Sequence, residues 1–337
     1  MPKYTVKIVP RTLPLAERFT IAVETWDAAH NVFVVVTFDG VTGVGESSPG
    51  SRWGESVDSV VADLEAVDLD AALASPFDLE AIERLLPPGA ARSALDIALH
   101  DLAARLAGVS MAELLGLGGR PLPPTSVTVP IAAVDAMVAR ARSLAEFPAL
   151  KLKVGFDGDV EVVARVREVY GGGIRIDANE GWDAEVAIDR LRALAPLGIE
   201  LCEQPVPKGD LDGLGAVTAS SPIPVFADED AGDATDVAAL YGRVHGVNLK
   251  LRKSGGIRAL TKAVAVARAH GMRVMIGCDL ESGIAATAGA SVASLCDVAD
   301  LDGPLLLADD PFPGVGYERG TMTLPAGPGL GIEGVPA

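Results

Sequence analysis

Short apolar runs that end in a charged residue repeat along residues 151–251. The runs are KLKVG at 151–155, IRIDANEGW at 174–182, IELCEQP at 199–205, PVFADED at 224–230 and VNLKL at 247–251. Their charged positions lie 22 to 26 residues apart, which is enough for one strand, one helix and two short loops. Because a charge in the middle of a buried strand is costly, we interpret each run as a buried strand with an ionisable residue at its tip.

The alternation of strand and helix extends from residue 126 almost to the end of the chain. Strands are predicted near SVTVPI, ALKLKV, GIRIDA, IELCEQ, IPVFAD, GVNLKL, RVMIGC and the LDGPLLL region. Helical patterns such as DVEVVARVREVY and IRALTKAVAVARAHG separate them. Eight strands with helical crossovers predict an α/β fold with a closed parallel barrel. The strand tips would then share one rim.

The first 120 residues follow a different pattern. The segments YTVKIV, FTIAVETW, NVFVVVTFDG and TGVGES are rich in β-formers, and Asp39-Gly40 is a tight-turn signal. They predict an antiparallel meander of three or four strands, followed by helices, the strongest of which covers residues 91–108 with one apolar face. The Gly- and Pro-rich segment 116–125 makes a natural boundary. We therefore expect an α+β domain at 1–120, the barrel at 121–318 and a tail at 319–337 that returns to the first domain.

Composition narrows the possible partners. Acidic residues outnumber basic ones by 46 to 28, and a net charge of −18 disfavours nucleic acid and anionic membrane surfaces as partners; an alternative is that the charge only serves solubility. The three cysteines have no C-x-x-C spacing, which favours free thiols in a reducing compartment. The apolar run at 32–38 is too short to cross a bilayer, and the N-terminus carries no signal-peptide pattern. We expect a soluble, cytoplasmic protein that forms a homo-oligomer.

Three successive strand tips offer carboxylates, Asp177, Glu203 and Asp228. Oxygen ligands without His or Cys are typical of Mg²⁺. A single Asp at such a rim is more often a helix cap or a surface charge, but three in succession make that alternative weaker. The tips on either side are Lys153 and Lys250. On a closed barrel they would face a central ligand from opposite sides.

Lysine acts as a general base only where a neighbouring cation or desolvation favours its neutral form. Lys151 lies two residues before Lys153 and points the same way from the strand, so it would supply that neighbouring charge. The alternative is that both are ordinary salt-bridge partners of the carboxylates.

The ordered set of motifs resembles the enolase superfamily, and most closely its muconate-lactonising-enzyme subgroup. The matching motifs are K-L-K at 151–153, D-A-N at 177–179, E-Q-P at 203–205, A-D-E at 227–229 and N-L-K at 248–250. The ALDIALHDL helix, the KSGGI segment after Lys250 and the closing PGLGI also match, so the resemblance covers nearly the whole chain. It implies an α+β capping domain over a (β/α)₇β barrel.

The resemblance also implies a site and a reaction. Asp177, Glu203 and Asp228 would bind Mg²⁺, and Lys153 and Lys250 would be the acid/base pair, assisted by Lys151. A divalent cation on a substrate carboxylate stabilises the ene-diolate formed when the α-proton leaves. With one base on each face, a proton removed from one side is replaced on the other, which inverts the stereocentre.

Asp300 and Asp302 resemble the acidic pair that holds the free ammonium of the substrate in dipeptide epimerases, and GCDLES at 277–282, with Asp279, resembles the same group. Two acids at i and i+2 on one strand face suit an ammonium ligand. Alternatively, Asp300 caps a helix and Asp302 lies in a turn. We also expect Asn179 to contact the substrate.

The first domain carries a departure from the Ala-Glu type of dipeptide epimerase, in which a capping loop supplies a basic residue. The corresponding stretch here, AVETWDAAH at 22–30, has Glu24 and Asp27 and no base. With the further rim acids Glu180, Asp230 and Asp279, this favours a dipeptide with a cationic side chain. Composition alone could supply these acids, and Trp26 could equally line an apolar pocket.

Two other functions compete with the dipeptide epimerase. A muconate cycloisomerase or an o-succinylbenzoate-synthase-like lyase would use the same lysines and metal, but neither needs Asp300 and Asp302 for an ammonium. A non-catalytic barrel that binds metal and peptide would need no base on either face, so the intact lysine pair argues against it. Arg52 and Trp53, in a Gly- and Ser-rich loop, could form a lid or an exposed turn.

Overall fold

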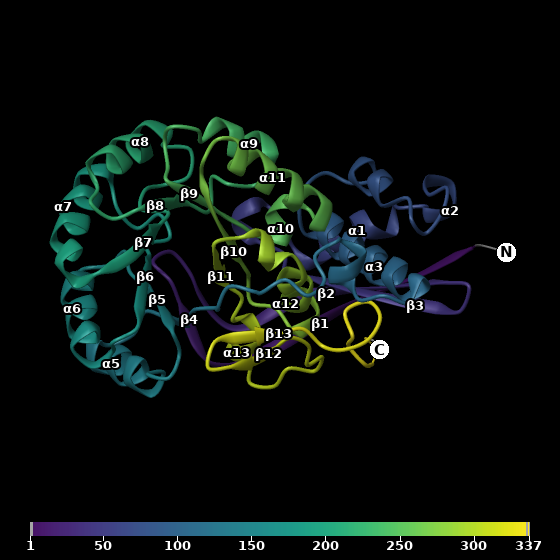
Figure 1. Ribbon diagram of the computed structural model, residues 1–337, viewed down its shortest axis with the longest axis horizontal. Helices are drawn as coiled ribbons and strands as arrows, with labels where there is room; N and C mark the ends of the chain where they lie inside the picture. Colours follow the sequence, from purple (N-terminus) through teal and green to yellow (C-terminus); the bar gives the residue numbers. More distant parts are fainter. Residues whose placement is uncertain (1–2, 335, 337) are drawn as a thin grey trace.

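The computed structural model describes residues 3–334 and 336. A three-stranded antiparallel sheet opens the chain, in the order β1 (Tyr4–Thr20), β2 (Thr25–Phe38) and β3 (Val41–Ser47). The short helices that follow are α1 (Val57–Glu65), α2 (Leu69–Ala72), the 3-10 turn at Leu79–Arg84, α3 (Ala90–Ala107) and α4 (Met111–Leu114). These elements form a cap on one side of a larger ring of strands and helices (Figure 1).

The β1–β2 hairpin extends from the cap to the middle of the ring, as the purple strands in Figure 1 show. Its turn lies within FTIAVETW, so this segment ends one strand and begins the next instead of forming a strand of its own. The amide of Ile21 closes the turn on the Glu24 carbonyl at 3.0 Å. The barrel covers one side of this turn: Ile21 is buried and the Ile131 amide donates to the Thr20 carbonyl at 2.9 Å, but Val23 at the tip is exposed.

Helix α3 is buried from Ala90 to Ala104, which is more than the one apolar face that its sequence predicts. Two glycines of β3 allow this close packing. A Cβ on Gly45 would lie 2.0 Å from the Ala94 carbonyl oxygen, and one on Gly43 would lie 2.2 Å from that of Ala98. The helix is therefore in direct backbone contact with the sheet, and its other side contacts the barrel helix α10 (Leu251–Ser254).

The remaining strands form one parallel eight-stranded sheet, in the order β4 to β11. They are β4 (Val127–Val129), β5 (Ala149–Lys153), β6 (Gly173–Asp177), β7 (Ile199–Glu203), β8 (Val225–Ala227), β9 (Gly246–Leu249), β10 (Arg273–Gly277) and β11 (Val298–Asp300). The ring closes where the Ser126 amide donates to the Ala299 carbonyl at 3.1 Å. The predicted closed barrel of (β/α)₇β type with an α+β cap is thus confirmed.

Helices between successive strands surround the barrel (Figure 1). They are α5 (Val134–Ser143), α6 (Asp159–Val169), α7 (Ala184–Leu194), α8 (Leu211–Ser220), α9 (Ala234–Ala239), α10 with α11 (Ile257–Ala269), and α12 (Gly283–Val292). Side chains such as Ile176, Leu249 and Ile276 are fully buried in the core. No helix in the described part of the chain is long and apolar enough to span a membrane.

The prediction of a strand over LDGPLLL is wrong. The eighth strand ends at Asp300, and Gly303–Leu306 forms the short helix α13, with Pro304 in its first turn, where a missing amide hydrogen costs nothing. The chain then forms the hairpin β12 (Gly316–Glu318) and β13 (Thr321–Thr323). Beyond it, the Leu330 amide donates to Asp101 of α3 at 2.7 Å, so the tail does contact the cap. The domain boundaries at residues 120 and 318 stay predictions.

Candidate functional site

The strand register brings the charged tips to one rim. Lys153 on β5 pairs with Asp177 on β6, and Asp177 pairs with Glu203 on β7. Asp228 directly follows β8, and Lys250 directly follows β9. Because β5 and β9 are four strands apart in a ring of eight, Lys153 and Lys250 approach the centre from opposite sides.

The three rim carboxylates lie close enough to share one ion. Each of Asp177, Glu203 and Asp228 has an oxygen within 4.8 Å of the others, and all three residues are buried. Burial and the charge of Asp177 raise the pKa of Glu203 to about 8. Burial also raises the pKa of Asp177, but the ammonium groups of Lys153 and Lys151 offset this and lower it to about 2. The lysines likewise lower the pKa of Asp228, so Glu203 is the member of the triad whose charged form burial disfavours most.

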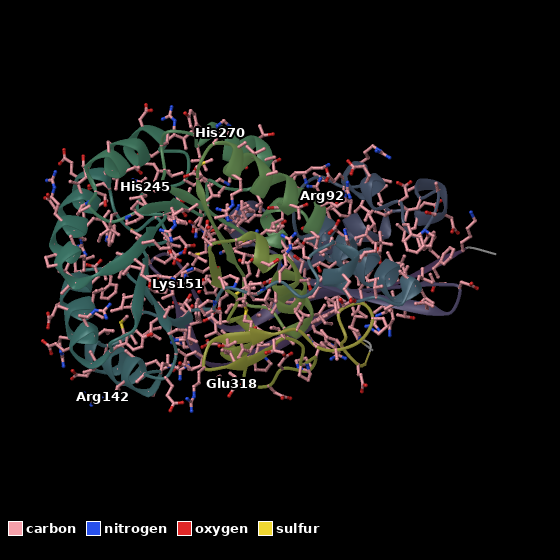
Figure 2. The ribbon with its side chains drawn as sticks, in the orientation of Figure 1. Arg92, Arg142, Lys151, His245, His270 and Glu318 are labelled. Carbon is pink, nitrogen blue, oxygen red and sulfur yellow. The ribbon has the colours of Figure 1, made fainter. Side chains whose placement is uncertain are left out.

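Lys151 lies beneath this triad, inside the barrel (Figure 2). Its Nζ is 3.1 Å from Asp177 Oδ2, 2.8 Å from Glu203 Oε2 and 2.7 Å from Asp300 Oδ2. Lys153 Nζ shares the same Asp177 oxygen at 2.7 Å and also donates to Asn179 Oδ1 at 3.1 Å. The two lysines are thus fixed on one carboxylate, and the sequence-based prediction that they lie on one side of the strand agrees with this geometry.

The opposite side of the site has its own lysine pair. Lys250 Nζ is 3.1 Å from Asp228 Oδ2. The fully buried Lys253 donates to the Asn248 carbonyl at 3.0 Å and contacts the carbonyl and carboxylate of Asp228. Lys253 was not predicted as a site residue from the sequence. It opens the KSGGI motif, about one helical turn after Lys250, and this position is the signal that could have identified it.

Unusual backbone conformations follow two of the acidic tips. Asn179, Glu180 and Gln204 have φ values of 42°, 68° and 32°, in the left-handed region that residues other than glycine seldom adopt. The Gln204 side chain uses this turn to reach the next strand, where its Oε1 accepts the Asp228 amide at 2.9 Å. Strained backbone of this kind concentrates at functional sites.

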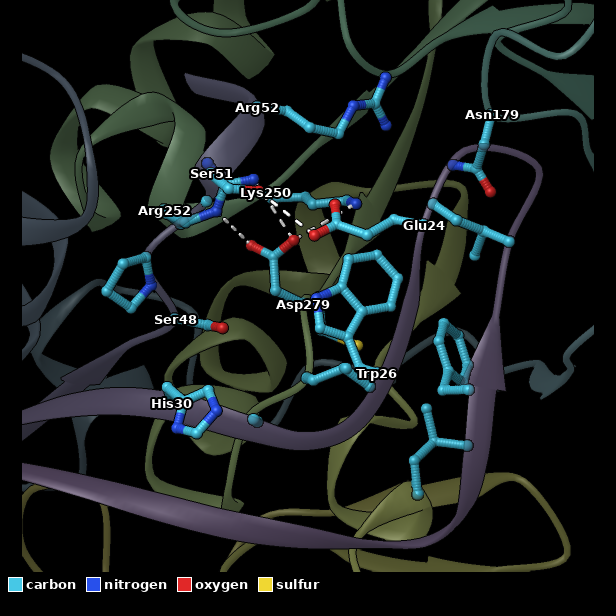
Figure 3. A pocket seen from close by; sticks show the side chains of 18 of the residues that line it. Glu24, Trp26, His30, Ser48, Ser51, Arg52, Asn179, Lys250, Arg252 and Asp279 are labelled. Carbon is cyan, nitrogen blue, oxygen red and sulfur yellow. Dashed lines mark hydrogen bonds and ion pairs between the residues drawn. The ribbon is translucent and has the colours of Figure 1, made fainter. Parts of the chain in front are cut away.

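A cavity of about 520 Å³ lies between the rim and the cap. The barrel contributes Lys151, Lys153, Asn179, Lys250, Asp279, Asp300 and Asp302, and the cap contributes Phe19, Glu24, Trp26, His30, Arg52 and Trp53, among others. Figure 3 shows Glu24 and Trp26 pointing into the cavity from the β1–β2 hairpin, toward Lys250, Arg252 and Asp279. Arg52 and Trp53 line the cavity from a 3-10 turn at Ser51–Trp53 whose residues Ser51 and Arg52 are exposed, so the segment is both a border of the cavity and an exposed turn, and its role as a lid stays a prediction.

Most of the acids that the sequence placed at the rim are already paired. Asp279 accepts from Arg252 Nε at 2.6 Å, and Glu180 forms an ion pair with Arg52. Asp230 accepts the Gly209 amide and the Gln204 amide group, both at 2.8 Å. Asp27 faces Arg18 at 2.9 Å and does not line the cavity.

Glu24 differs from these acids. It is half-buried at the hairpin tip and forms no ion pair within the described residues; its carboxylate accepts only a 3.3 Å hydrogen bond from the Ser51 hydroxyl. Of the rim acids expected from the sequence, Glu24 is the one that lines the cavity without an ion-pair partner among the described residues; Asp230 is bonded only to amide groups and lies outside the cavity lining. Arg252 was not predicted as a site residue from the sequence, because its partner Asp279 lies 27 residues away along the chain.

Asp300 and Asp302 both line the cavity next to Lys151. Asp300 accepts from the Ser126 hydroxyl at 2.5 Å and from Lys151, so both its oxygens are engaged. Asp302 accepts the Thr128 amide with Oδ2 at 2.6 Å and also interacts with the Thr128 side chain, and its Oδ1 lies 3.9 Å from the Cys278 thiol. Burial and the charge of Asp300 raise the pKa of Asp302 to about 6. Asp302 thus retains an oxygen for a ligand, and Asp300 ends a strand instead of capping a helix.

Comparison with known proteins decides the family. The profile described as "Mandelate racemase / muconate lactonizing enzyme, N-terminal domain" matches residues 3–116, and "Enolase C-terminal domain-like" matches residues 133–336. The chain belongs to the enolase superfamily. It is 40% identical to the L-Ala-D/L-Glu epimerase of Bacteroides thetaiotaomicron over 98% of this chain and 88% of that protein. The resemblance seen in the motifs is thereby confirmed.

Solved structures of this superfamily have the same architecture. A substrate-liganded L-Ala-D/L-Glu epimerase from Bacillus subtilis superimposes with a TM-score of 0.93 at 33% identity, covering 99% of both chains. A dipeptide epimerase from Enterococcus faecalis, in complex with Mg and the dipeptide L-Leu-L-Tyr, gives a TM-score of 0.91 at 32% identity, again over 99% of both chains.

The site of this superfamily member fits a metal ion by its own geometry. Three buried carboxylates offer only hard oxygen donors within 4.8 Å of one another. Glu203 Oε2 has one cationic neighbour within the described residues, Lys151 Nζ at 2.8 Å, and the same ammonium group is shared with Asp177 and Asp300. A divalent cation would give the three carboxylates a positive charge that they do not have to share with Asp300.

Proposed function

We propose that this protein is a dipeptide epimerase that inverts the α-carbon of the C-terminal residue of a dipeptide. One observation carries the proposal: Lys153 and Lys250 approach a single cavity from opposite sides of the barrel, with a carboxylate triad between them. Relatives of this chain that are 36–40% identical over most of its length are named L-Ala-D/L-Glu epimerase, L-Ala-D/L-amino acid epimerase and hydrophobic dipeptide epimerase, which supports the same reaction class.

The reaction needs a base on each face of the α-carbon. The proton beside a carboxylate is weakly acidic, so a single lysine can remove it only if the developing charge is stabilised. In the proposed reaction, one lysine takes the proton from its face and the other, in its ammonium form, returns a proton to the opposite face. Mg²⁺ held by Asp177, Glu203 and Asp228 would supply positive charge at the substrate carboxylate.

The two ends of the dipeptide have separate partners in this proposal. Asp302, with its available oxygen, and the neighbouring Asp300 would bind the free ammonium group. Asn179 borders the cavity beside Lys153 and would limit how far the substrate backbone can move. Neither a cycloisomerase nor an o-succinylbenzoate-synthase-like lyase needs an ammonium site, so this pair favours the epimerase.

The preferred side chain is proposed to be cationic. Glu24 is the uncompensated carboxylate that the hairpin directs into the cavity, and Trp26 beside it offers a ring face for the aliphatic part or the charge of a Lys or Arg side chain. Arg52 and Arg252 also line the cavity, but their charges are matched by Glu180, Glu229 and Asp279.

The test is deuterium incorporation. Dipeptides of varied sequence are incubated with the protein and Mg²⁺ in D₂O, and the product is analysed by mass and by diastereomer separation. An epimerase incorporates deuterium at the α-carbon of the C-terminal residue and forms a new diastereomer. If no dipeptide exchanges, the proposal fails.

Lysine variants test the roles of the two bases. Lys153→Ala and Lys250→Ala should each abolish inversion, because each removes the base on one face. A residual exchange without inversion should remain for the one epimer whose proton faces the intact lysine. A variant pair that both invert at the wild-type rate would contradict the two-base assignment.

A further inference from the structure

A buried polar pair joins the cap to the rim of the barrel. Asn31 on β2 and Glu46 on β3 are both 0% exposed, and Asn31 Nδ2 donates to Glu46 Oε1 at 2.8 Å. Neither side chain lines the cavity. A fully buried carboxylate is costly unless its oxygens are satisfied, so the partners of Glu46 indicate what it is for.

The other side-chain hydrogen bonds of this pair, within the described residues, reach the loop after β10 and the first turn of α12. Asn31 Nδ2 donates to the Leu280 carbonyl at 2.9 Å. Glu46 accepts from the Ser282 amide at 2.9 Å, from the Ser282 hydroxyl at 2.5 Å and from the Ala285 amide at 3.2 Å. The cap thereby holds the first turn of a barrel helix and the loop before it.

This loop reaches the reacting side of the site. Cys278, Asp279 and Leu280 line the cavity. Asp279 is the second carboxylate near Lys250, at 3.7 Å from its Nζ, and it binds Arg252, whose guanidinium lies 4.1 Å above the ring of Trp53. Continuous contacts therefore run from Glu46 through the loop to Asp279 and on to Lys250.

The other lysine is connected to the cap by a different route. Lys153 donates to Asn179, Asn179 Nδ2 donates to Glu229 at 3.3 Å, and Glu229 pairs with Arg52 of the cap at 3.1 Å. No hydrogen bond or ion pair joins Lys153 to residues 278–285 within the described chain. The Asn31–Glu46 pair therefore reaches the Lys250 side of the site and not the Lys153 side.

We propose that Glu46 and Asn31 are positioning residues for one of the two bases. They fix the loop that carries Asp279, and Asp279 fixes the ammonium of Lys250, so that loosening the pair impairs proton transfer on the Lys250 face alone. The inference rests on the proposed epimerase function.

The experiment compares the two epimers of one dipeptide. Ala-Lys and Ala-Glu, each in L,L and L,D form, are incubated in D₂O, and Lys250→Ala identifies the epimer whose proton Lys250 removes. Glu46→Gln keeps the size of the side chain but places an amide group against donors. Glu46→Gln should slow α-proton exchange of the epimer that Lys250 deprotonates by about tenfold or more, because small displacements of a base lower the rate strongly. Exchange of the other epimer should stay within about twofold of wild type. Asn31→Ala should act in the same direction.

Asp101→Asn is the matched control. Asp101 is a buried cap carboxylate that accepts from the Val44 and Leu330 amides, with no bond to the loop. This variant should slow both epimers equally or not at all. Equal slowing of both epimers by Glu46→Gln, or no slowing in a folded variant, overturns the proposal.

A second measurement does not depend on activity. Amide hydrogen exchange of residues 278–285 should be faster in Glu46→Gln than in wild type and unchanged in Asp101→Asn. If wild type exchanges no dipeptide, the epimerase function fails, and the amide exchange alone decides whether the cap holds the loop. If amide hydrogen exchange of residues 278–285 is the same in Glu46→Gln as in wild type, the inference is overturned.

Discussion

Charged residues of the same type at the rim differ in whether they have an ion-pair partner, and the residue type alone does not predict this. Asp279 and Glu24 both border the cavity, yet Asp279 is neutralised by Arg252 and Glu24 is not. The carboxylate tips were predictable because each closes an apolar run at a regular interval. The pairing of Asp279 with Arg252, or of Lys253 with Asp228, depends on neighbouring strands and could not be predicted from local sequence.

Substrate preference should depend on Glu24. Glu24→Gln removes the uncompensated charge, so kcat/KM for dipeptides with a Lys or Arg side chain should fall about tenfold, while neutral dipeptides change little. Glu24→Arg should shift the preference toward acidic side chains. The measurement is kcat/KM over a matched set of dipeptides. An equal loss for cationic and neutral dipeptides would rule out charge recognition by Glu24.

His100 should make stability depend on pH. Burial lowers the pKa of this imidazole, but Asp96, with Oδ1 at 3.3 Å, raises it above the ordinary value of 6.5. Because the folded state then binds the proton more tightly than the unfolded state, protonated His100 adds to the free energy of unfolding. This stabilisation is complete below about pH 6.5 and is lost as the pH rises through the raised pKa. The difference in unfolding free energy between wild type and His100→Gln should therefore shrink as the pH rises above about 6.5. A constant or growing difference would contradict this assignment.

At the scale of elements, close backbone contact between β3 and α3 fixes the cap. Gly45→Ala should destabilise the protein by about 1–3 kcal/mol, since the new Cβ meets the backbone of Ala94 and Ala98. Gly171→Ala is the control, because nothing lies within 4 Å of its Cβ, and it should stay within about 1 kcal/mol of wild type. Chemical denaturation measures both. Equal stability of the two variants would show that α3 can move away from the sheet.

The barrel elements were predictable where the period of the hydrophobic residues and the length of the segment both indicated the same secondary structure, as in β5, β6 and α11. Two segments were not. FTIAVETW has the composition of a strand, but it contains the turn between β1 and β2, with Phe19 and Ile21 buried and Val23 exposed. LDGPLLL has the apolar run of a strand, but Pro304 and the end of the sheet at Asp300 favour a short helix. In both cases tertiary packing decides between conformations that local propensity allows.

At the scale of the whole molecule, ion binding should be visible in stability. Mg²⁺ that binds only the folded triad should stabilise the protein by about 2.7 kcal/mol at a hundredfold excess over Kd, relative to EDTA-treated protein. Glu203→Gln should abolish this response. Without the ion it should be no less stable than wild type, since burial and Asp177 raise the pKa of Glu203 to about 8. Scanning calorimetry with and without Mg²⁺ measures both effects, and an equal response of the two proteins would place the ion elsewhere.

The hairpin that reaches from the cap into the barrel mouth has a consequence for how such enzymes diversify. Its tip brings Glu24 and Trp26 to the cavity, where we propose that they contact the side chain of the substrate, but the lysines and the carboxylate triad come from the barrel. A few exchanges in this short turn can alter which side chains are accepted while the reacting groups keep their places. Substrate preference can therefore change through single substitutions in this turn, each of which leaves the reacting groups in place.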